Sequence, residues 1–254
     1  MKRAPINGPV LAKAIAPWRL DLREETGSTN ADASAAAKAG ALEGNVILAE
    51  AQTNGRGRMD RSWVSPPRAG LALSILLRPR IEMARWGWLP LLAGVALAET
   101  VAALETTAEV ALKWPNDLLL DGRKCAGILA EAAVPGAVVV GVGLNVSLER
   151  AELPIENATS LQLAGVKEDD RTVIAGLLIN RFRERYDAWQ AGEDVRETYL
   201  LQCGTIGRQV RILLPDGSEL AGEATTVDGD GRLVILDNRG ELCPIAAGDV
   251  THVR

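Results

Sequence analysis

The regular spacing of turn signals near the C-terminus constrains the fold of this 254-residue chain more than any other feature. From residue 205 to 254, short apolar runs alternate with Asp-Gly and Asn-Arg-Gly turns at intervals of about ten residues. This pattern is typical of a small all-β barrel or sandwich. Longer helical patterns precede it, so the sequence predicts two domains, residues 1–204 and residues 205–254.

The larger domain combines helical and strand patterns, which predicts an α+β fold with a mixed sheet flanked by helices. Helical patterns cover 28–40, 83–105 and 171–190, and strand patterns cover 45–52, 71–77, 109–114 and 137–146. The last helix has an apolar stripe of Val173, Ile174, Leu177, Leu178, Phe182, Tyr186 and Trp189. Residues 1–22 show no strong pattern and are expected to form a loosely ordered arm or a short edge element.

The charge balance and the scarcity of cysteine and histidine exclude several classes of function. With 33 acidic and 28 basic residues, the net charge of −5 argues against broad, nonspecific nucleic-acid binding. Cys125, Cys203 and Cys243 are far apart, and His252 is the single histidine. We therefore predict no metal site and no disulfide framework. The cysteines are expected to be small buried hydrophobes and His252 to lie at the surface.

Neither a membrane segment nor an export signal is predicted, which indicates a cytoplasmic protein. Lys13 and three prolines interrupt the apolar residues of the first 20 positions. The longest apolar run, around Leu89–Leu104, contains Glu99 and is expected to be too short and too polar to cross a bilayer.

The sequence NGRGRMDRSW at 54–63 is a cationic island in an acidic chain. Gly55 and Gly57 allow the backbone to approach a ligand closely, and Arg56 and Arg58 offer forked positive charge suited to phosphate or carboxylate. The alternative is an ordinary exposed surface loop.

A second candidate segment is KWPNDLLLDGRKCAG at 113–127. A strand ends at Lys113, and Asn116 and Asp117 follow it. Asp121-Gly122 predicts a hairpin turn, across which the side chains of Asp117 and Lys124 can converge. A lysine beside an aspartate can serve a phosphate and its Mg²⁺, whereas the alternative is a Pro-Asn-Asp turn and a solvated lysine.

Two further segments offer weaker signals. Gly141 and Gly143 remove side chains from one face of a strand, which indicates either a surface for a ligand or a bend in the strand. The small polar residues at 28–30 can bind a polar ligand or cap a helix. Gln52, at the end of a buried strand, needs a hydrogen-bond partner.

The order of these motifs resembles the biotin protein ligase (biotin–[acetyl-CoA-carboxylase] ligase) family over residues 25–254. The matching residues are STN at 28–30, Gln52, GRGR at 55–58, Trp63, KWPND at 113–117, Lys124, AGILAE at 126–131 and GVGLN at 141–145. The resemblance implies a catalytic domain similar to class II aminoacyl-tRNA synthetases and an SH3-like C-terminal domain. It implies a reaction in which biotin and MgATP give biotinyl-5′-AMP, from which biotin passes to a lysine of a biotin carboxyl carrier protein of a biotin-dependent carboxylase.

The resemblance also implies roles for individual residues. Lys124, Arg58 and Asp117 would be catalytic. The biotin-binding residues would be Ser28, Thr29, Asn30, Gln52, Gly55, Arg56, Gly57, Arg58, Lys124, Gly127, Gly141 and Gly143. The ATP-binding residues would be Arg56, Arg58, Trp63, Lys113, Asn116, Asp117, Lys124 and Asn145.

Three departures from the family pattern stand out. Met59 and Asp60 replace a basic residue and a glycine in the loop at 54–63, called the arginine loop below. Cys125 stands where a larger apolar residue is common. Only 27 residues precede Ser28, so no winged-helix domain, no repressor function and no nucleic-acid binding are expected. No membrane partner is expected, and family members suggest a homodimer through the sheet of the large domain.

Three other readings remain open. A lipoate or octanoate ligase would carry out the same class of reaction with a more apolar, elongated pocket. A biotin-responsive DNA-binding repressor belongs to a different class, as does a biotin-binding module without catalysis. Retention of Arg58, Asp117 and Lys124 argues against the last.

Overall fold

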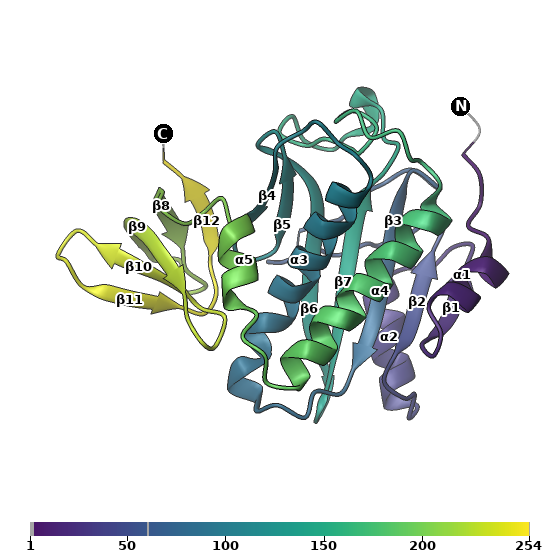
Figure 1. Ribbon diagram of the computed structural model, residues 1–254, viewed down its shortest axis with the longest axis horizontal. Coiled ribbons are helices and arrows are strands. Elements are labelled where there is room, and N and C mark those ends of the chain that lie inside the picture. Colours follow the sequence, from purple (N-terminus) through teal and green to yellow (C-terminus); the bar gives the residue numbers. More distant parts are fainter. Residues whose placement is uncertain (1–2, 60, 254) are drawn as a thin grey trace.

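A seven-stranded mixed sheet forms the centre of the larger part of the chain, in a computed structural model that describes residues 3–59 and 61–253 (Figure 1). Its strands are β1 (Arg19–Arg23), β2 (Asn45–Ala49), β3 (Gly70–Leu77), β4 (Val110–Lys113), β5 (Asp117–Leu120), β6 (Arg123–Val134) and β7 (Ala137–Asn145). The spatial order is β1-β2-β3-β7-β6-β5-β4. The β1–β2 pair is parallel and the other neighbours are antiparallel. The predicted α+β architecture is confirmed.

Helices cover both faces of this sheet, which is why its strands are apolar on both sides. The helix α2 (Thr29–Lys38) packs on one face against β2, β3, β6 and β7 (Figure 1). The other face carries α1 (Gly8–Ala14), α3 (Trp88–Ala103) and α4 (Arg171–Gln190). In β2, Val46 and Leu48 join the large core, whereas Ile47 points to the small cluster under α2. Alanines on α2 allow it to lie close to the sheet.

The 171–190 helix is confirmed, but its buried stripe differs from the predicted one. Val173 is 43% exposed, whereas Arg171, Ala175 and Ile179 are buried. The helix lies between α3, the sheet and α1, so its buried surface is wider than a single stripe and is rotated away from Val173.

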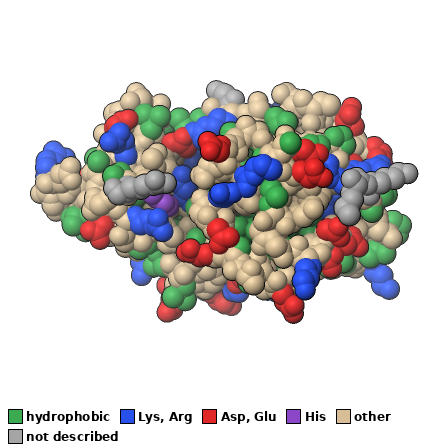
Figure 2. Space-filling model, turned by 90° about the horizontal axis from the view of Figure 1, so that it is seen from above, with side chains coloured by type: hydrophobic (Ala, Val, Ile, Leu, Met, Phe, Trp, Pro, Cys, Tyr) green, Lys and Arg blue, Asp and Glu red, His purple; other side chains and the backbone are tan. Residues whose placement is uncertain are grey.

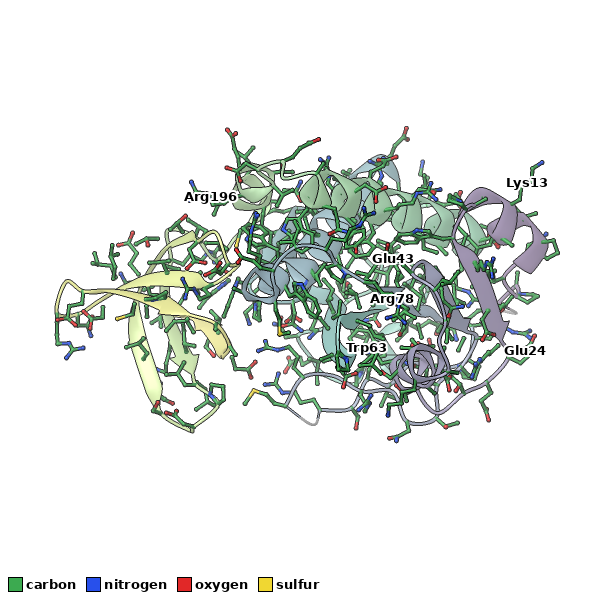
Figure 3. All side chains as sticks on the ribbon, turned by 90° about the horizontal axis from the view of Figure 1, so that it is seen from below. Lys13, Glu24, Glu43, Trp63, Arg78 and Arg196 are labelled. Atoms are coloured by element: carbon green, nitrogen blue, oxygen red, sulfur yellow. The ribbon has the colours of Figure 1, made fainter. Side chains whose placement is uncertain are left out.

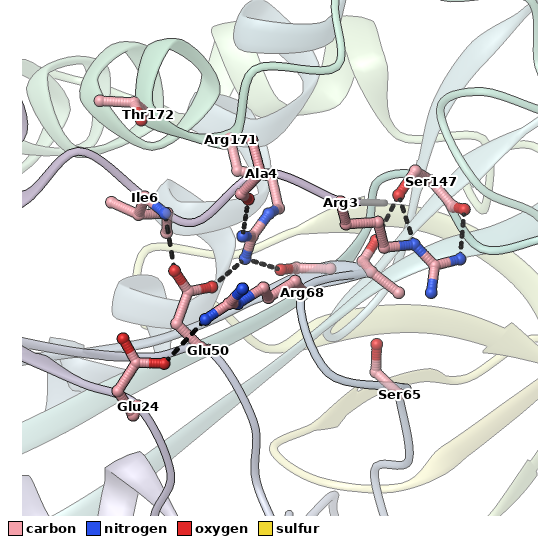
Figure 4. A network of polar contacts seen from close by, with 12 residues as sticks. Arg3, Ala4, Ile6, Glu24, Glu50, Ser65, Arg68, Ser147, Arg171 and Thr172 are labelled. Atoms are coloured by element: carbon pink, nitrogen blue, oxygen red, sulfur yellow. Dashed lines mark hydrogen bonds and ion pairs between the residues drawn. The ribbon is translucent and has the colours of Figure 1, made fainter. Parts of the chain in front are cut away.

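Of the two alternatives for the N-terminal residues, the short edge element is confirmed, and the loosely ordered arm is wrong for residues 3–22. These residues form α1 and then β1, the edge strand of the sheet, and Leu11 and Ile15 are fully buried. Figure 4 shows how distant residues hold the segment before α1. The Ile6 N–H donates to Glu50 Oε1 at 2.6 Å, and Glu50 also pairs with Arg171 at 2.6 Å. These partners are far away in sequence, so no local pattern revealed them.

The C-terminal residues form a second, five-stranded antiparallel sheet. Its strands are β8 (Gln209–Leu213), β9 (Glu219–Val227), β10 (Leu233–Asp237), β11 (Leu242–Ile245) and β12 (Asp249–His252), in the order β11-β10-β9-β8-β12. Three short helices of the larger part precede it in the chain: η1 (Met83–Gly87), η2 (Arg150–Glu152) and α5 (Arg196–Gln202). The predicted small β unit is confirmed.

Two tryptophans of the larger part bind the small sheet through one of its turns. Trp88 Nε1 donates to the Gly229 carbonyl at 2.9 Å, and Trp114 Nε1 donates to the Gly231 carbonyl at 3.2 Å. Gly231 has a φ of 81° and packs against Gly87, where a Cβ would overlap the backbone. These contacts fix the position of β12 relative to the ends of β4 and β5.

The helical segment Met83–Ala103 is long and apolar enough to cross a membrane, contrary to the expectation for this region. However, 67% of its most apolar window is buried inside the protein, as is usual for the core helix of a globular fold. Its α3 part packs against α4 and the sheet, which accounts for its apolar composition.

Candidate active site

A cavity of about 600 Å³ lies on the face of the main sheet that carries α2. It is bounded by the start of α2, the 54–64 loop, the β5–β6 hairpin and strand β12 of the small sheet. The structure brings nearly all predicted site residues together here: Ser28, Thr29, Asn30, Gln52, Arg56, Gly57, Arg58, Trp63, Lys113, Asn116, Asp117, Lys124, Gly127, Gly141, Gly143 and Asn145. Gly55 belongs to the 54–64 loop but is outside this lining, and it borders a second pocket formed with the same loop.

The floor of the cavity is a row of paired residues that crosses the sheet. Ala72, Gly143, Gly127, Asp117 and Lys113 are successive partners from β3 to β4. The two glycines leave the middle of this row free of side chains, and the Trp63 ring lies over it, close to Gly127 and Gly143 (Figure 3). A Cβ at Gly143 would overlap this ring, so glycine is required by packing.

A β-bulge places Lys124 on the cavity side of β6. Leu118 pairs with Ala126, but Leu119 pairs with Lys124, so one extra residue is inserted at Cys125. Lys124 and Gly127 are three positions apart, and side chains alternate along a regular strand. Without the bulge they would therefore face opposite sides of the sheet. The bulge brings both to the cavity, while the Cys125 side chain is fully buried in the core.

The end of the cavity beside α2 is lined by uncharged side chains that are joined by hydrogen bonds. The Thr29 N–H donates to Gln52 Oε1 at 2.8 Å, and Ser74 Oγ lies 2.7 Å from Thr29 Oγ1 and 2.6 Å from Asn30 Oδ1. Asn30 Nδ2 donates to Glu131 Oε2 at 2.7 Å. Ser28 is the N-cap position of α2, but its side chain makes no capping bond. This end therefore presents hydroxyl and amide groups with little free charge.

The arginine loop closes the cavity through contacts with both sheets. The Trp63 N–H donates to the Gly55 carbonyl at 2.9 Å, so the loop folds back on itself. Arg56 pairs with Glu131 at 3.1 Å, and Arg61 pairs with Asp249 of the small sheet. Met59, one of the two loop residues that depart from the family pattern, has a left-handed φ of 54°. The other, Asp60, lies outside the described residues.

The opposite end of the cavity is strongly cationic. Lys124 Nζ lies 2.6 Å from Asp117 Oδ1, which confirms the predicted convergence of these side chains. Burial lowers the pKa of Lys113, and Lys124 and Arg61 lower it further, whereas Asp117 raises it. Burial also lowers the pKa of Arg58, whose guanidinium donates to Asn116 Oδ1 at 3.3 Å and to the Gly248 carbonyl at 3.3 Å. Several positive groups thus surround one carboxylate, an arrangement suited to a polyanion.

Two segments of the lining were not predicted from the sequence. One is the loop of Pro154, Ile155, Asn157 and Ala158, which runs beside Lys124 through a parallel bridge between Lys124 and Ala158. The other is Asp249, Thr251 and His252 on β12. The prediction of a surface role for His252 is wrong, because its ring is half-buried against Thr205 at 3.1 Å. Among the cysteines, Cys125 and Cys203 are buried, as predicted, but Cys243 is partly exposed.

Substitution of Gly141 tests the packing at the neutral end. A Cβ at this position would overlap Asn30 Oδ1. We expect Gly141→Ala to displace Asn30, whose hydrogen bonds to Ser74 and Glu131 would be lost. The affinity for a ligand bound at this end of the cavity should then fall about tenfold. Gly229→Ala is the matched control, because a Cβ there meets nothing within 4 Å. Equal affinities measured for the two variants by titration calorimetry would contradict this prediction.

The environment of His252 predicts a dependence of stability on pH. Burial lowers its pKa from 6.5 to about 4, and the charges of Lys113 and Arg208 add to this effect. Between these two pH values the unfolded chain binds more protons than the folded chain, so the His252 contribution to stability is lost as the pH falls from 6.5 to about 4. We expect His252→Asn to lose stability less steeply than the parent across this window in denaturant titrations. Parallel curves for the two proteins would rule this out.

Two regions of the chain match described protein families. Residues 27–147 match the biotin/lipoate A/B protein ligase family, and residues 205–253 match the biotin protein ligase C terminal domain. The second match coincides with the small sheet.

Relatives and solved structures agree with these matches. The chain is 45% identical over 243 residues to the biotin–[acetyl-CoA-carboxylase] ligase of Mycobacterium tuberculosis, covering 93% of this chain and 90% of that protein. It is 35% identical to the bifunctional ligase/repressor BirA of Bacillus subtilis, over 84% of this chain and 68% of that protein. Among solved structures, the biotin protein ligase from Aquifex aeolicus in complex with biotin and ATP superposes with a TM-score of 0.79 at 27% identity, covering 92% of this chain and 98% of that one.

Proposed function

We propose, since this chain belongs to the biotin/lipoate A/B protein ligase family, that it activates biotin with ATP to biotinyl-5′-AMP and transfers biotin to a lysine of a biotin carboxyl carrier protein. The observation that carries this function is the division of one cavity into a neutral polar end at Thr29 and Gln52 and a cationic end at Lys124. Biotin has a neutral ureido ring and a carboxylate, and ATP adds a triphosphate. The two ends match these groups in polarity and charge.

In the first step, a carboxylate oxygen of biotin attacks the α-phosphorus of ATP. A bond forms between these atoms, the bond from the α-phosphorus to the bridging oxygen breaks, and pyrophosphate leaves with the electron pair. Both reactants are anions, so fixed cations relieve their repulsion. We assign Lys124 and Arg58 to the acyl-phosphate junction and Lys113 to the phosphates. Asn116 and Asp117 lie beside these groups and hold Arg58 and Lys124 in place.

In the second step, the amine of the carrier lysine attacks the acyl carbon, AMP leaves, and a proton is released from the new amide. Asp117 is the carboxylate beside Lys124 and is our choice for accepting this proton. Trp63 covers the glycine floor and would pack against the adenylate, with Asn145 at the nucleotide end. Ser28, Thr29, Asn30 and Gln52 would bind the ureido group. Gly141 and Gly143 would support the biotin site indirectly, because Asn30 packs on Gly141 and Trp63 packs on Gly143.

Mg²⁺ would enter with ATP as part of the substrate. Within residues 3–59 and 61–253, no group of three or more histidine, cysteine, aspartate or glutamate side chains is arranged to hold a metal ion. Asp117 contacts Lys124 in the cationic cluster and would approach the hydrated ion.

We further propose a cytoplasmic ligase without DNA binding, divided into domains at residues 204/205, that forms a homodimer through the sheet of its large domain. The net charge of −5 supports the absence of DNA binding. On the face in Figure 2, acidic and basic side chains alternate, instead of forming one broad basic area. A gel-shift assay with a biotin operator sequence tests the absence of DNA binding, and a sedimentation measurement tests the homodimer.

The decisive experiment measures ATP-dependent pyrophosphate release with biotin, lipoate and octanoate in parallel. It then measures transfer of the activated acid to a biotin carrier domain. We expect turnover with biotin but not with lipoate or octanoate, and we expect the label on one lysine of the carrier domain. Turnover with lipoate would keep the mechanism and change the substrate, whereas biotin binding without any turnover would establish a binding module.

A further inference from the structure

We propose that His252 of β12 forms a subsite for the outer two phosphates of ATP, which leave as pyrophosphate. The small C-terminal sheet would then take part directly in the first chemical step. We rest this proposal on biotin adenylation, the function proposed above, and add to it a binding site for the leaving group.

The first support is a row of charged groups that ends at His252. Lys124 contacts Asp117 at 2.6 Å, and Asp117 is paired with Lys113 across β5 and β4. Lys113 is in turn one of the two cations whose charge acts on His252, the other being Arg208. If the α-phosphate lies at Lys124, a triphosphate that follows this row brings its outer phosphates to Lys113 and His252. Thr251 and His252 line the same cavity.

The second support is a hydrogen-bond relay that fixes the tautomer of His252. The Trp114 N–H donates to Thr205 Oγ1 at 3.2 Å, and Thr205 Oγ1 lies 3.1 Å from His252 Nε2. Thr205 is fully buried, and within the described residues Nε2 is the acceptor in reach of its hydroxyl hydrogen. A buried hydroxyl needs an acceptor, so we assign Nε2 as the acceptor and place the ring proton on Nδ1. Among residues 3–59 and 61–253 no hydrogen bond to Nδ1 is present, so the Nδ1–H can donate to a ligand.

The third support is the charge state of the ring. Burial and the facing cations Lys113 and Arg208 lower the pKa of His252 to about 4, so the imidazole is neutral near pH 7. The acid nearest to it on its own strand, Asp249, pairs with Arg61 of the loop. A neutral N–H donor adds no repulsion to the neighbouring cations when the site is empty. When the bond at the α-phosphorus breaks, negative charge grows on the departing pyrophosphate, and this donor would stabilise it.

The test compares His252→Ala and His252→Asn with the parent protein in both directions of the first step. Asparagine keeps an N–H donor near the position of Nδ1. We expect His252→Ala to raise the KM for ATP about tenfold or more, and to raise the KM for pyrophosphate similarly when biotinyl-5′-AMP and pyrophosphate are converted back to ATP and biotin. We expect His252→Asn to restore most of this loss. Biotin affinity and transfer from preformed biotinyl-5′-AMP to the carrier should not change, and Arg239→Ala, an exposed change in the same sheet, should match the parent.

Thr205 is a positioning residue in this proposal and gives an independent readout. Thr205→Ser keeps the hydroxyl and should retain both KM values, whereas Thr205→Val should raise them in the same ratio as His252→Ala. A general loss of folding would instead lower kcat for both half-reactions.

Three results are decisive against parts of this account. Unchanged KM values in His252→Ala, with an active parent protein, would overturn the phosphate subsite alone. An equal loss in transfer from biotinyl-5′-AMP would place His252 at the adenylate or the carrier and also overturn it. A parent protein that releases no pyrophosphate with biotin would overturn the proposed function, and the subsite with it.

Discussion

Replacing Lys124 with alanine is expected to lower the rate of biotin-dependent pyrophosphate release by on the order of 10³-fold. The Lys124 ammonium is the cation that the β6 bulge places in the cavity beside Asp117. Without it, the carboxylate of biotin and the α-phosphate would approach each other with less compensation of their charge, and Asp117 would add further repulsion. The side chain is 27% exposed, so its loss leaves no buried cavity and the fold should be retained.

The measurement for Lys124 is single-turnover formation of biotinyl-5′-AMP, with circular dichroism to verify folding. Lys13→Ala is the matched control, because Lys13 is exposed on α1, at the end of the molecule away from the small sheet (Figure 3). A Lys124→Ala/Asp117→Asn double variant separates the two effects. It should recover part of the rate if the unpaired carboxylate contributes to the loss. Pyrophosphate release near the parent rate in Lys124→Ala would remove this lysine from the mechanism.

Replacing Arg58 with glycine is expected to release activated biotin and to increase labelling of unrelated proteins about tenfold or more. Arg58 joins the loop to Asn116 of the main sheet and to the Gly248 carbonyl of the small sheet. Hydrogen bonds of a charged group contribute about 1.5–3 kcal/mol each, which is enough to shift the loop towards open states by that factor. Biotinyl-5′-AMP that escapes reacts with exposed lysines without selection.

The measurement for Arg58 is the ratio of label on a bystander protein to label on the carrier domain, at equal total biotin consumption. Arg58→Lys keeps the charge but loses the forked geometry, so we expect an intermediate ratio. Arg80→Gly, a change at an exposed arginine outside the cavity, should behave as the parent. Labelling confined to the carrier in Arg58→Gly would show that the intermediate is retained by other groups.

The sequence alone determined the fold class, the main elements and most of the residues that line the cavity. These features follow from local patterns: Asp121 and Gly122 both adopt the positive φ that the predicted hairpin turn requires, and the Ala-rich segment after Ser28 is a helix. Lys113 and Asp117 stand at strand ends and Thr29 begins a helix, whereas the motif glycines of β6 and β7 lie inside their strands. The topology brings all of them to one face of the sheet. Their placement was therefore accessible without coordinates, although their roles rest on the family.

Only the tertiary structure decided which distant residues complete the site and how they are oriented. The burial of Trp63 on Gly143 depends on two segments that meet only in the folded sheet, and the bulge at Cys125 alone turns Lys124 towards Gly127. His252 enters the cavity because the indoles of Trp88 and Trp114 bind a turn of the small sheet. These contacts of Trp63, Trp88 and Trp114 join residues 80 or more positions apart, so their energies appear in no local pattern of the sequence.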